Sequence, residues 1–105
     1  MMDNYILDGH KPVIEPDLHK WANWYGTANR HVDCSTIGDI RVSTVFLGID
    51  HSFCNSKKQL FETMTFGDKD EYCERCETWE EAEKMHKTAC DLVKEDNKKR
   101  QGLYG

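Results

Sequence analysis

The pattern of apolar residues is clearest after residue 78, where it predicts an amphipathic helix. Thr78 and Glu81 form a capping box, in which each side chain bonds the free backbone N–H of the other residue. Apolar positions then recur at intervals of three and four, which is the spacing of one helix face. They are Trp79, Ala82, Met85, His86, Ala89, Leu92 and Val93. His86 lies on this stripe, so we expect a hydrogen-bonded histidine at the edge of the core.

A shorter helix is predicted near the start of the chain. Pro16 suits the first helical position, because its missing N–H would have no partner there. Apolar residues follow at helical spacing. They are Leu18, Trp21, Ala22, Tyr25 and Ala28. Ahead of this helix, residues 5–7 read as a short strand closed by the turn pair Asp8-Gly9, and residues 11–14 continue in extended form.

Four further segments predict strands of one antiparallel sheet. Residues 40–49 are rich in β-branched side chains and contain no proline. Residues 60–66 follow them after a polar loop, and residues 30–35 and 72–77 flank the pair. The expected fold class is therefore α+β, a two-layer sandwich in which an antiparallel sheet of three to five strands carries two helices on one face.

The strand at residues 40–49 is apolar on both sides. Its alternating faces carry Ile40, Val42 and Phe46 on one side, and Val45, Leu47 and Ile49 on the other. In the next strand, Phe61 lies on the opposite face from Leu60, Met64 and Phe66. A sheet covered on one side is normally polar on its free face. The pattern therefore indicates an interface with another protein or a second copy, or else cover by the N-terminal segment or the tail. The residues predicted to bind a partner are Asp39, Arg41, Val45, Leu47, Asp50, His51 and Phe61.

The length of 105 residues suits a single domain, with residues 1–100 folded and residues 101–105 as a loose C-terminal tail. No run approaches the ~18 apolar residues of a membrane span. The first residues lack the basic and apolar regions of a signal peptide. The five cysteines favour a reducing compartment, because an odd number leaves one unpaired. These features predict a protein of the cytoplasm with no membrane partner.

The net charge of −5 is concentrated in residues 62–83, which carry nine acidic and two basic side chains. Acidic side chains repel phosphates, so nucleic-acid binding is disfavoured. The segment would instead suit a basic partner, and a nucleic-acid mimic that binds through it remains an open alternative. The other interpretation is a solvated acidic face that only aids solubility.

Paired potential metal ligands stand at His51-x-x-Cys54 and Cys73-x-x-Cys76. Two ligands separated by two residues are typical of a zinc knuckle, in which a tight turn aims both at one ion. If residues 72–77 form a strand, however, Cys73 and Cys76 point to opposite faces. No glycine loosens either pair into a knuckle. We therefore treat these four residues as weak metal candidates and expect no metal and no other cofactor.

The pair Asp50-His51 is the strongest candidate for a catalytic or ligand-binding site. It stands where the strand meets a polar loop that runs to Gln59, and a neighbouring carboxylate can orient and charge an imidazole. Ser52 or Cys54 would have to supply a nucleophile. The alternative is an exposed histidine at a strand end, and no catalytic residue is predicted.

Three segments together resemble a known family. They are residues 38–51, Gly-Asp-Ile-Arg-Val-Ser-Thr-Val-Phe-Leu-Gly-Ile-Asp-His; residues 60–67, Leu-Phe-Glu-Thr-Met-Thr-Phe-Gly; and residues 78–83, Thr-Trp-Glu-Glu-Ala-Glu, with His86. Together with Trp21-x-x-Trp24 they are similar to small uncharacterised accessory proteins of tailed bacteriophages and prophages, over about residues 5–90. The resemblance implies a viral protein made in a bacterial host, and it implies no activity. Family members tend to have tyrosine where Cys76 stands and no cysteine at position 54, which weakens the zinc interpretation.

These observations favour an accessory protein that acts by protein–protein interaction over an enzyme. We expect its partner to be a host or phage protein, through which it would redirect host metabolism or block an anti-phage defence. A homodimer through the free face of the sheet is the alternative arrangement. A small enzyme or ligand binder at the Asp50-His51 loop and a zinc module are the other hypotheses.

Overall fold

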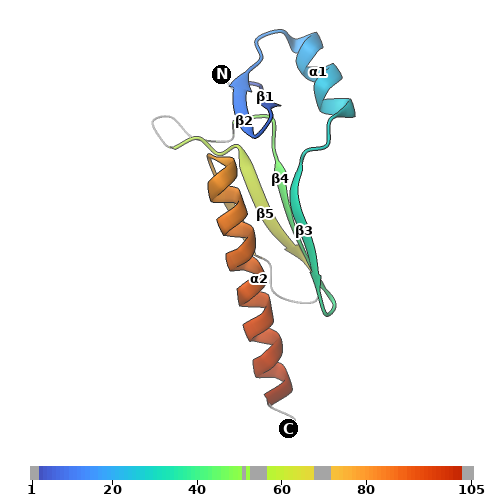
Figure 1. Ribbon diagram of the computed structural model, residues 1–105, viewed down its shortest axis with the longest axis vertical. Coiled ribbons are helices and arrows are strands. Elements are labelled where there is room, and N and C mark those ends of the chain that lie inside the picture. Colours follow the sequence, from blue (N-terminus) through green and yellow to red (C-terminus); the bar gives the residue numbers. More distant parts are fainter. Residues whose placement is uncertain (1–2, 51, 53–56, 68–71, 103–105) are drawn as a thin grey trace.

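The computed structural model describes residues 3–50, 52, 57–67 and 72–102, the last of these without the side chains at 97 and 99–102. Its centre is a four-stranded antiparallel sheet in which each strand lies beside its neighbour in the chain (Figure 1). The strands are β3 (His31–Ile37), β4 (Ile40–Phe46), β5 (Phe61–Phe66) and β6 (Cys73–Cys76). One long helix, α2 (Trp79–Gly102), packs along one face of this sheet.

The predicted α+β class is confirmed, with two helices and antiparallel sheets of two and four strands. The strand predicted at residues 40–49 ends at Phe46, because the backbone turns at Gly48, whose φ is 78°. A side chain at Gly48 would also meet the Tyr25 ring, about 3.0 Å from its Cε2. The second helix continues through Gly102, and residues 103–105 lie outside the described residues.

The capping box at the start of α2 is confirmed. The Thr78 hydroxyl accepts the Glu81 N–H at 3.2 Å, and the Glu81 carboxylate accepts the Thr78 N–H at 3.2 Å. The same carboxylate accepts a hydrogen bond from Lys57 at 2.7 Å. The hydrogen bond from the Lys57 ammonium, which lies outside the helix, is the largest cause of the lowered pKa of Glu81.

The core under α2 has two clusters of buried apolar residues. The first comprises Tyr5, Phe46, Leu60, Phe61 and Ala82. The second comprises Ile40, Val42, Ala89, Cys90 and Val93. Residues 40, 42 and 46 of β4 therefore all face the helix, as the alternation along that strand predicts. Neither helix in the described part of the chain is both long and apolar enough to cross a membrane.

A polar network separates the two clusters, and His86 lies at its centre. His86 is only 4% exposed, and its Nδ1 is 2.7 Å from the Thr44 hydroxyl. Its Nε2 is 2.9 Å from the Ser35 hydroxyl and 3.6 Å from the Asp33 carboxylate. The Thr44 hydroxyl also bonds that of Thr63 on β5. The expected hydrogen-bonded histidine at the core edge is thus confirmed, and it links α2 to three strands.

An N-terminal hairpin and a short helix close one end of the sheet. They comprise β1 (Tyr5–Asp8), β2 (Lys11–Ile14) and α1 (Leu18–Thr27). The α1 helix begins after Asp17, whose carboxylate accepts the N–H groups of His19 and Lys20. This N-cap explains why the helix starts later than the proline alone suggested.

Side chains of α1 contact both the N-terminal hairpin and the four-stranded sheet. The Trp21 indole N–H lies 3.1 Å from two carbonyl oxygens, of Tyr5 in β1 and of Gly48 after β4. Trp24 meets Phe46 edge-on, on the side of the sheet that α2 covers. The hairpin reaches α2 as well, because His10 stacks on Trp79 with ring centroids 3.8 Å apart.

Candidate functional site

The sheet face opposite α2 is the candidate functional surface, and we call it the open face. The strand register places its side chains in three rows across the sheet. The rows are Thr36, Arg41 and Phe66; then Cys34, Ser43, Met64 and Cys73; then His31, Val45, Glu62 and Arg75. The α2 helix contacts all four strands from the other side, where Val42, Phe46 and Phe61 are buried, and α1 contacts β1.

The apolar part of the open face runs diagonally through Val45, Met64 and Phe66. Phe66 is 48% exposed, and the other two are half-buried. The Arg41 guanidinium lies over the Phe66 ring, 5.8 Å from its centroid, at the distance of a cation–π contact. Ser43, in the middle row, is buried. The surface therefore offers apolar contact beside the planar hydrogen-bond donors of an arginine.

The other end of the open face carries an ion pair. Glu62 accepts a hydrogen bond from Arg75 Nε at 2.8 Å, across β5 and β6. The Cys73 thiol lies 3.7 Å from the same carboxylate. Burial, followed by the charge of Glu62, raises the pKa of Cys73. The thiol is therefore held protonated, which makes it a poor nucleophile and a poor metal ligand.

The structure divides the residues predicted to bind a partner. Arg41 and Val45 lie on the open face, and Asp39 is exposed in the turn before β4. Leu47 is half-buried after β4, and its N–H bonds the Leu60 carbonyl. The placement of Phe61 on the free face is wrong. It pairs with Phe46, is 0% exposed and belongs to the core under α2.

Met64 and Phe66 take the place that Phe61 was expected to hold. The sequence pattern correctly placed Met64 and Phe66 on the face opposite Phe61. In the structure that face is the open face, and Phe61 lies on the face that α2 covers. The missing information was the register between β4 and β5. Pairing Phe46 with Phe61 would have identified it, since both are large aromatics suited to one core.

The Asp50 carboxylate forms hydrogen bonds to the backbone at the start and near the end of the loop that follows it. Its carboxylate accepts the backbone N–H of Ser52 at 2.9 Å and that of Gln59 at 3.0 Å. Burial alone would raise the pKa of this carboxyl, but the hydrogen bonds from Gln59 and Ser52 outweigh it, and the pKa lies below its ordinary value. Its predicted partner His51 lies outside the described residues. The Asp50 carboxylate is thus already committed to closing the loop.

Replacing Asp50 with asparagine is expected to lower the free energy of unfolding at neutral pH by about 1 kcal/mol, because the neutral amide oxygen accepts these two hydrogen bonds more weakly than the partly solvated carboxylate does. The folded-state pKa is below the unfolded value of about 3.9, so this stabilisation is present above that pH. It is lost as the pH falls through the folded-state pKa. Urea unfolding of both proteins at a series of pH values measures the difference.

The exposed residue Asp91 on α2 provides the control, since Asp91→Asn removes the same charge without removing a loop brace. We expect wild type and Asp50→Asn to converge in acid. A stability difference that stays constant from neutral to strongly acidic pH would show that the carboxylate charge does not hold the loop.

The cysteine pair in β6 has its thiols on opposite faces of the sheet, as its spacing in a strand predicts. Cys73 pairs with Met64 on the open face, whereas Cys76 pairs with Phe61 and packs against the core. Burial raises the pKa of Cys76 to about 11. The two thiols therefore cannot meet as a redox pair or converge on one ion. Cys54, the other cysteine candidate, lies outside the described residues.

The acidic segment at residues 62–83 does not form one surface in the part that the structure describes. Glu62 lies on the open face and is paired with Arg75. Glu81 lies at the start of α2 and is paired with Lys57. Residues 68–71, with three of the nine acids, lie outside the described residues. Glu62 and Glu81 therefore lie in separate ion pairs at different places on the molecule, which weakens the nucleic-acid mimic as an interpretation.

Comparison with protein-family models, with curated proteins and with solved structures found no match to the chain.

Proposed function

We propose that this protein is a non-catalytic accessory protein that acts by binding another protein through the open face of its sheet. The observation that supports this most is Phe66, a large aromatic 48% exposed beside Arg41 on a face opposite the long helix. Exposed aromatic residues and arginines dominate the binding energy of protein interfaces. Exposed apolar surface of this kind more often belongs to an interface than to a catalytic site.

Four of the described titratable residues, His86, Asp50, Cys73 and Cys76, support binding over catalysis. His86 is buried under α2, and its partner Thr44 is 0% exposed, so neither can reach a substrate. Asp50 is engaged by two backbone N–H groups. The Cys73 and Cys76 thiols both have raised pKa values. Each of these groups thus has a structural explanation that requires no reaction.

The size of the open face is consistent with the centre of an interface. Four strands about 4.8 Å apart, with about 3.3 Å per residue along β4, give a surface of roughly 15 by 20 Å. That is less than half of the roughly 800 Å² that each partner buries in an interface of standard size. A partner would therefore also contact the rim, where the exposed Asp39 stands in the turn before β4.

The biological setting rests on the resemblance to accessory proteins of tailed bacteriophages. In that setting the protein acts in the cytoplasm of the bacterial host, and its partner is a host or phage protein. Binding would then redirect host metabolism or block an anti-phage defence. A second copy of the chain is the alternative occupant of the open face.

The test compares two substitutions at equally exposed apolar residues. Phe66 on the open face is 48% exposed, and Leu92 on α2 is 49% exposed. Tagged wild type, Phe66→Ala, Arg41→Ala and Leu92→Ala are used to capture proteins from host lysate, and the affinity of each captured protein is then measured with the purified pair. We expect Phe66→Ala and Arg41→Ala to weaken binding by about tenfold or more.

Leu92→Ala is expected to bind as wild type does, since it lies on the other side of the molecule. Sedimentation of the bait alone distinguishes a second copy from a different partner. The proposal fails if the open-face variants bind as tightly as wild type, or if the folded wild-type bait captures no protein and does not self-associate.

A further inference from the structure

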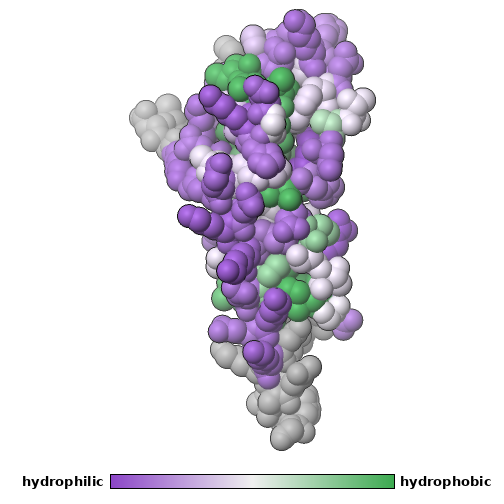
Figure 2. Space-filling view, viewed as in Figure 1, coloured by the Kyte–Doolittle hydropathy of each residue, from purple (hydrophilic) through white to green (hydrophobic). Residues whose placement is uncertain are grey.

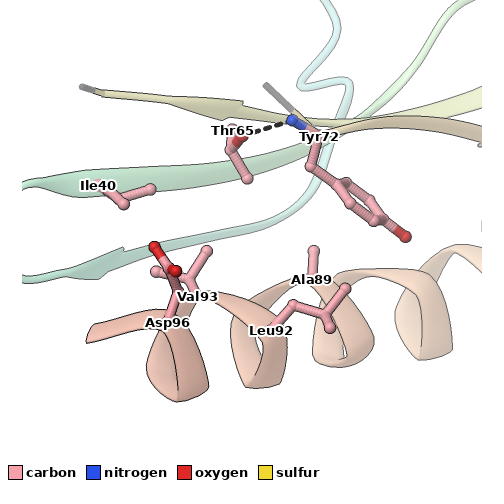
Figure 3. Close-up of a pocket in the computed structure, with 7 residues that line it drawn as sticks. All are labelled: Ile40, Thr65, Tyr72, Ala89, Leu92, Val93 and Asp96. Carbon is pink, nitrogen blue, oxygen red and sulfur yellow. Dashed lines mark hydrogen bonds between the residues drawn. The ribbon is translucent and has the colours of Figure 1, made fainter. Parts of the chain in front are cut away.

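A charged side chain beside exposed apolar surface offers a partner both apolar contact and a charge to pair with. In Figure 2, hydrophobic residues show through beside the C-terminal half of α2, whose outward surface is hydrophilic. A cavity of about 320 Å³ lies between α2 and the sheet, but Asp96 in its lining already has an interaction of its own (Figure 3). On the opposite side of the sheet, Arg41 stands beside the exposed ring of Phe66. This pair is where the open face can add a new charge interaction.

The guanidinium of Arg41 has no carboxylate partner in the part of the chain that the structure describes. Its side chain is exposed, and its described contact is with the Phe66 ring, 5.8 Å from the centroid. Arg75, the other arginine of the open face, differs, because its Nε donates a hydrogen bond to Glu62 at 2.8 Å. Arg75 is therefore already engaged within the protein, whereas the N–H groups of Arg41 can bind a carboxylate that comes from outside.

Arg41 is held in a geometry that suits a carboxylate. It pairs with Phe66 across β4 and β5, and the residues on either side of it, Ile40 and Val42, are buried under α2. The core therefore holds the backbone that carries Arg41, and contact with the aromatic ring restricts its side chain. A guanidinium presents five N–H donors in a planar fork, which matches the two oxygens of a carboxylate. A side chain that is already restricted loses less entropy when it binds.

The apolar side chains of the open face begin beside this pair. Met64 is in the row next to that of Phe66, and Val45 is in the row beyond it. Neighbouring rows on one face of a sheet are about 7 Å apart, since each residue of a strand advances about 3.3 Å. A segment that places a carboxylate over Arg41 can therefore place an apolar side chain over Met64. The chemistry that fits this surface is an acidic residue with an apolar neighbour.

The local charge favours a single carboxylate over a polyanion. The three rows of the open face contain two arginines and one glutamate, a net charge of +1 with histidine neutral, whereas the whole chain carries −5. The net positive charge of the face attracts an acidic side chain, but the protein as a whole repels the many phosphates of a nucleic acid. The exposed Asp39, in the turn before β4, adds to that repulsion.

We propose that the open face recognises an acidic and apolar segment of its partner protein, in which an aspartate or glutamate pairs with Arg41 and an adjacent apolar side chain packs on Phe66 and Met64. This inference rests on the proposed function and names the chemistry of the partner. The charge pair sets the orientation and the choice of partner, and the apolar contact supplies the burial. A segment with a neutral or basic residue at the matching position is rejected, because Arg41 would lose hydration without gaining a charged acceptor.

The experiment selects binders of the full chain from an mRNA-displayed library of random peptides about twelve residues long, which can cross the open face as a helix or as a strand. Peptides that also bind Phe66→Ala are removed, so that the remaining ones depend on the open face. We expect these to carry an aspartate or glutamate close to a large apolar side chain. Isothermal titration calorimetry then measures the affinity of a synthetic peptide with the most enriched sequence.

A double-mutant cycle tests the charge pair directly. Arg41→Gln in the protein, and replacement of the acidic residue of the peptide by its amide, are each expected to weaken binding about tenfold. The two changes together are expected to cost about as much as either one alone. Arg41→Lys keeps the charge but not the planar fork, so we expect an intermediate loss. Lys87→Gln removes a positive charge from an exposed position on α2 and is expected to bind the peptide as wild type does.

The outcomes distinguish this inference from the proposed function. Peptides that depend on Phe66 but carry no acidic residue, or that bind Arg41→Gln as tightly as wild type, overturn the charge pair and leave the interaction surface in place. If every enriched peptide binds Phe66→Ala equally well, the open face is not the interaction surface and both proposals fail. A labelled single-stranded RNA that binds wild type but not Phe66→Ala or Arg41→Gln would assign the face to phosphates and also overturn the inference. Circular dichroism verifies that each variant is folded.

Discussion

Replacing Phe61 with alanine is expected to lower the free energy of unfolding by about 3–5 kcal/mol. Phe61 is fully buried and packs against Phe46 with ring centroids 5.2 Å apart, and against Trp79 edge-on. Removal of the ring takes away apolar burial and leaves a cavity between the sheet and the first turn of α2. Single domains are stable by only about 5–15 kcal/mol, so this one change removes a large part of the total. Urea unfolding followed by circular dichroism measures it.

Phe66 provides the matched control, because it stands in the same strand and undergoes the same substitution on the opposite face. Since Phe66 is about half exposed, we expect Phe66→Ala to change the free energy of unfolding by less than about 1 kcal/mol. Equal losses at the two positions would contradict the assignment of the two faces. The same comparison shows whether a loss of partner binding by Phe66→Ala reflects the surface or the fold.

The polar network at His86 leads to the second large effect. Thr44→Val keeps the shape of the side chain but removes the hydroxyl that lies 2.7 Å from His86 Nδ1. That nitrogen and the Thr63 hydroxyl are then left under α2 without this partner. We expect a loss of about 1–3 kcal/mol in the free energy of unfolding, measured by urea unfolding. Thr36→Val, at an exposed threonine of β3, is the control and should change stability by less than about 0.5 kcal/mol.

A double-mutant cycle between Thr44→Val and Thr63→Val separates this network from a simple change of volume. Each single substitution removes one of two hydroxyls that bond each other. The double variant removes both, so its loss should be smaller than the sum of the two single losses. We expect an interaction free energy of about 0.5–3 kcal/mol. Strict additivity would mean that the two hydroxyls do not depend on each other.

Most of the secondary structure could be predicted because it depends on local pattern. The capping box of Thr78 and Glu81 uses residues three apart, and the apolar stripe behind it specifies the face that α2 buries. The alternation along β4 likewise placed Val42 and Phe46 on one side. What the pattern could not supply was the pairing of one strand with the next.

The exchange of Phe61 for Phe66 in the candidate site illustrates this limit. Alternation within β5 correctly separated Phe61 from Met64 and Phe66, but it did not show which set meets α2. That depends on the register with β4, and a slip of one residue reverses every side chain. Residues 47–60 between the two strands contain no two-residue turn signal such as Asn-Gly, so the sequence did not specify this register.

The partners of His86 and the space beside Ala89 could not be predicted either, because both depend on residues that are far apart in the chain. The sequence placed His86 on the buried stripe, but its partners Ser35 and Thr44 are 51 and 42 residues away in the chain. A cavity between α2 and the sheet is lined by Ala89 from the helix and by Ile40 and Thr65 from β4 and β5, which are distant from it in the chain. No local pattern reports the distance between two layers.

The order of the strands has a consequence for how the chain folds. Each ladder of the four-stranded sheet joins neighbours in the chain, so the sheet can grow by successive hairpins, of which the one from Phe46 to Phe61 has the longest loop to close. The contacts of Tyr5 with Gly48 and of Asn4 with Ile49 instead close a loop of more than forty residues. By the logarithmic dependence of loop entropy on length, that closure costs about 1 kcal/mol more than joining β4 to β5. We therefore expect the N-terminal hairpin and α1 to dock onto a sheet that has already formed, and their backbone amides to exchange hydrogen before those of β4 and β5.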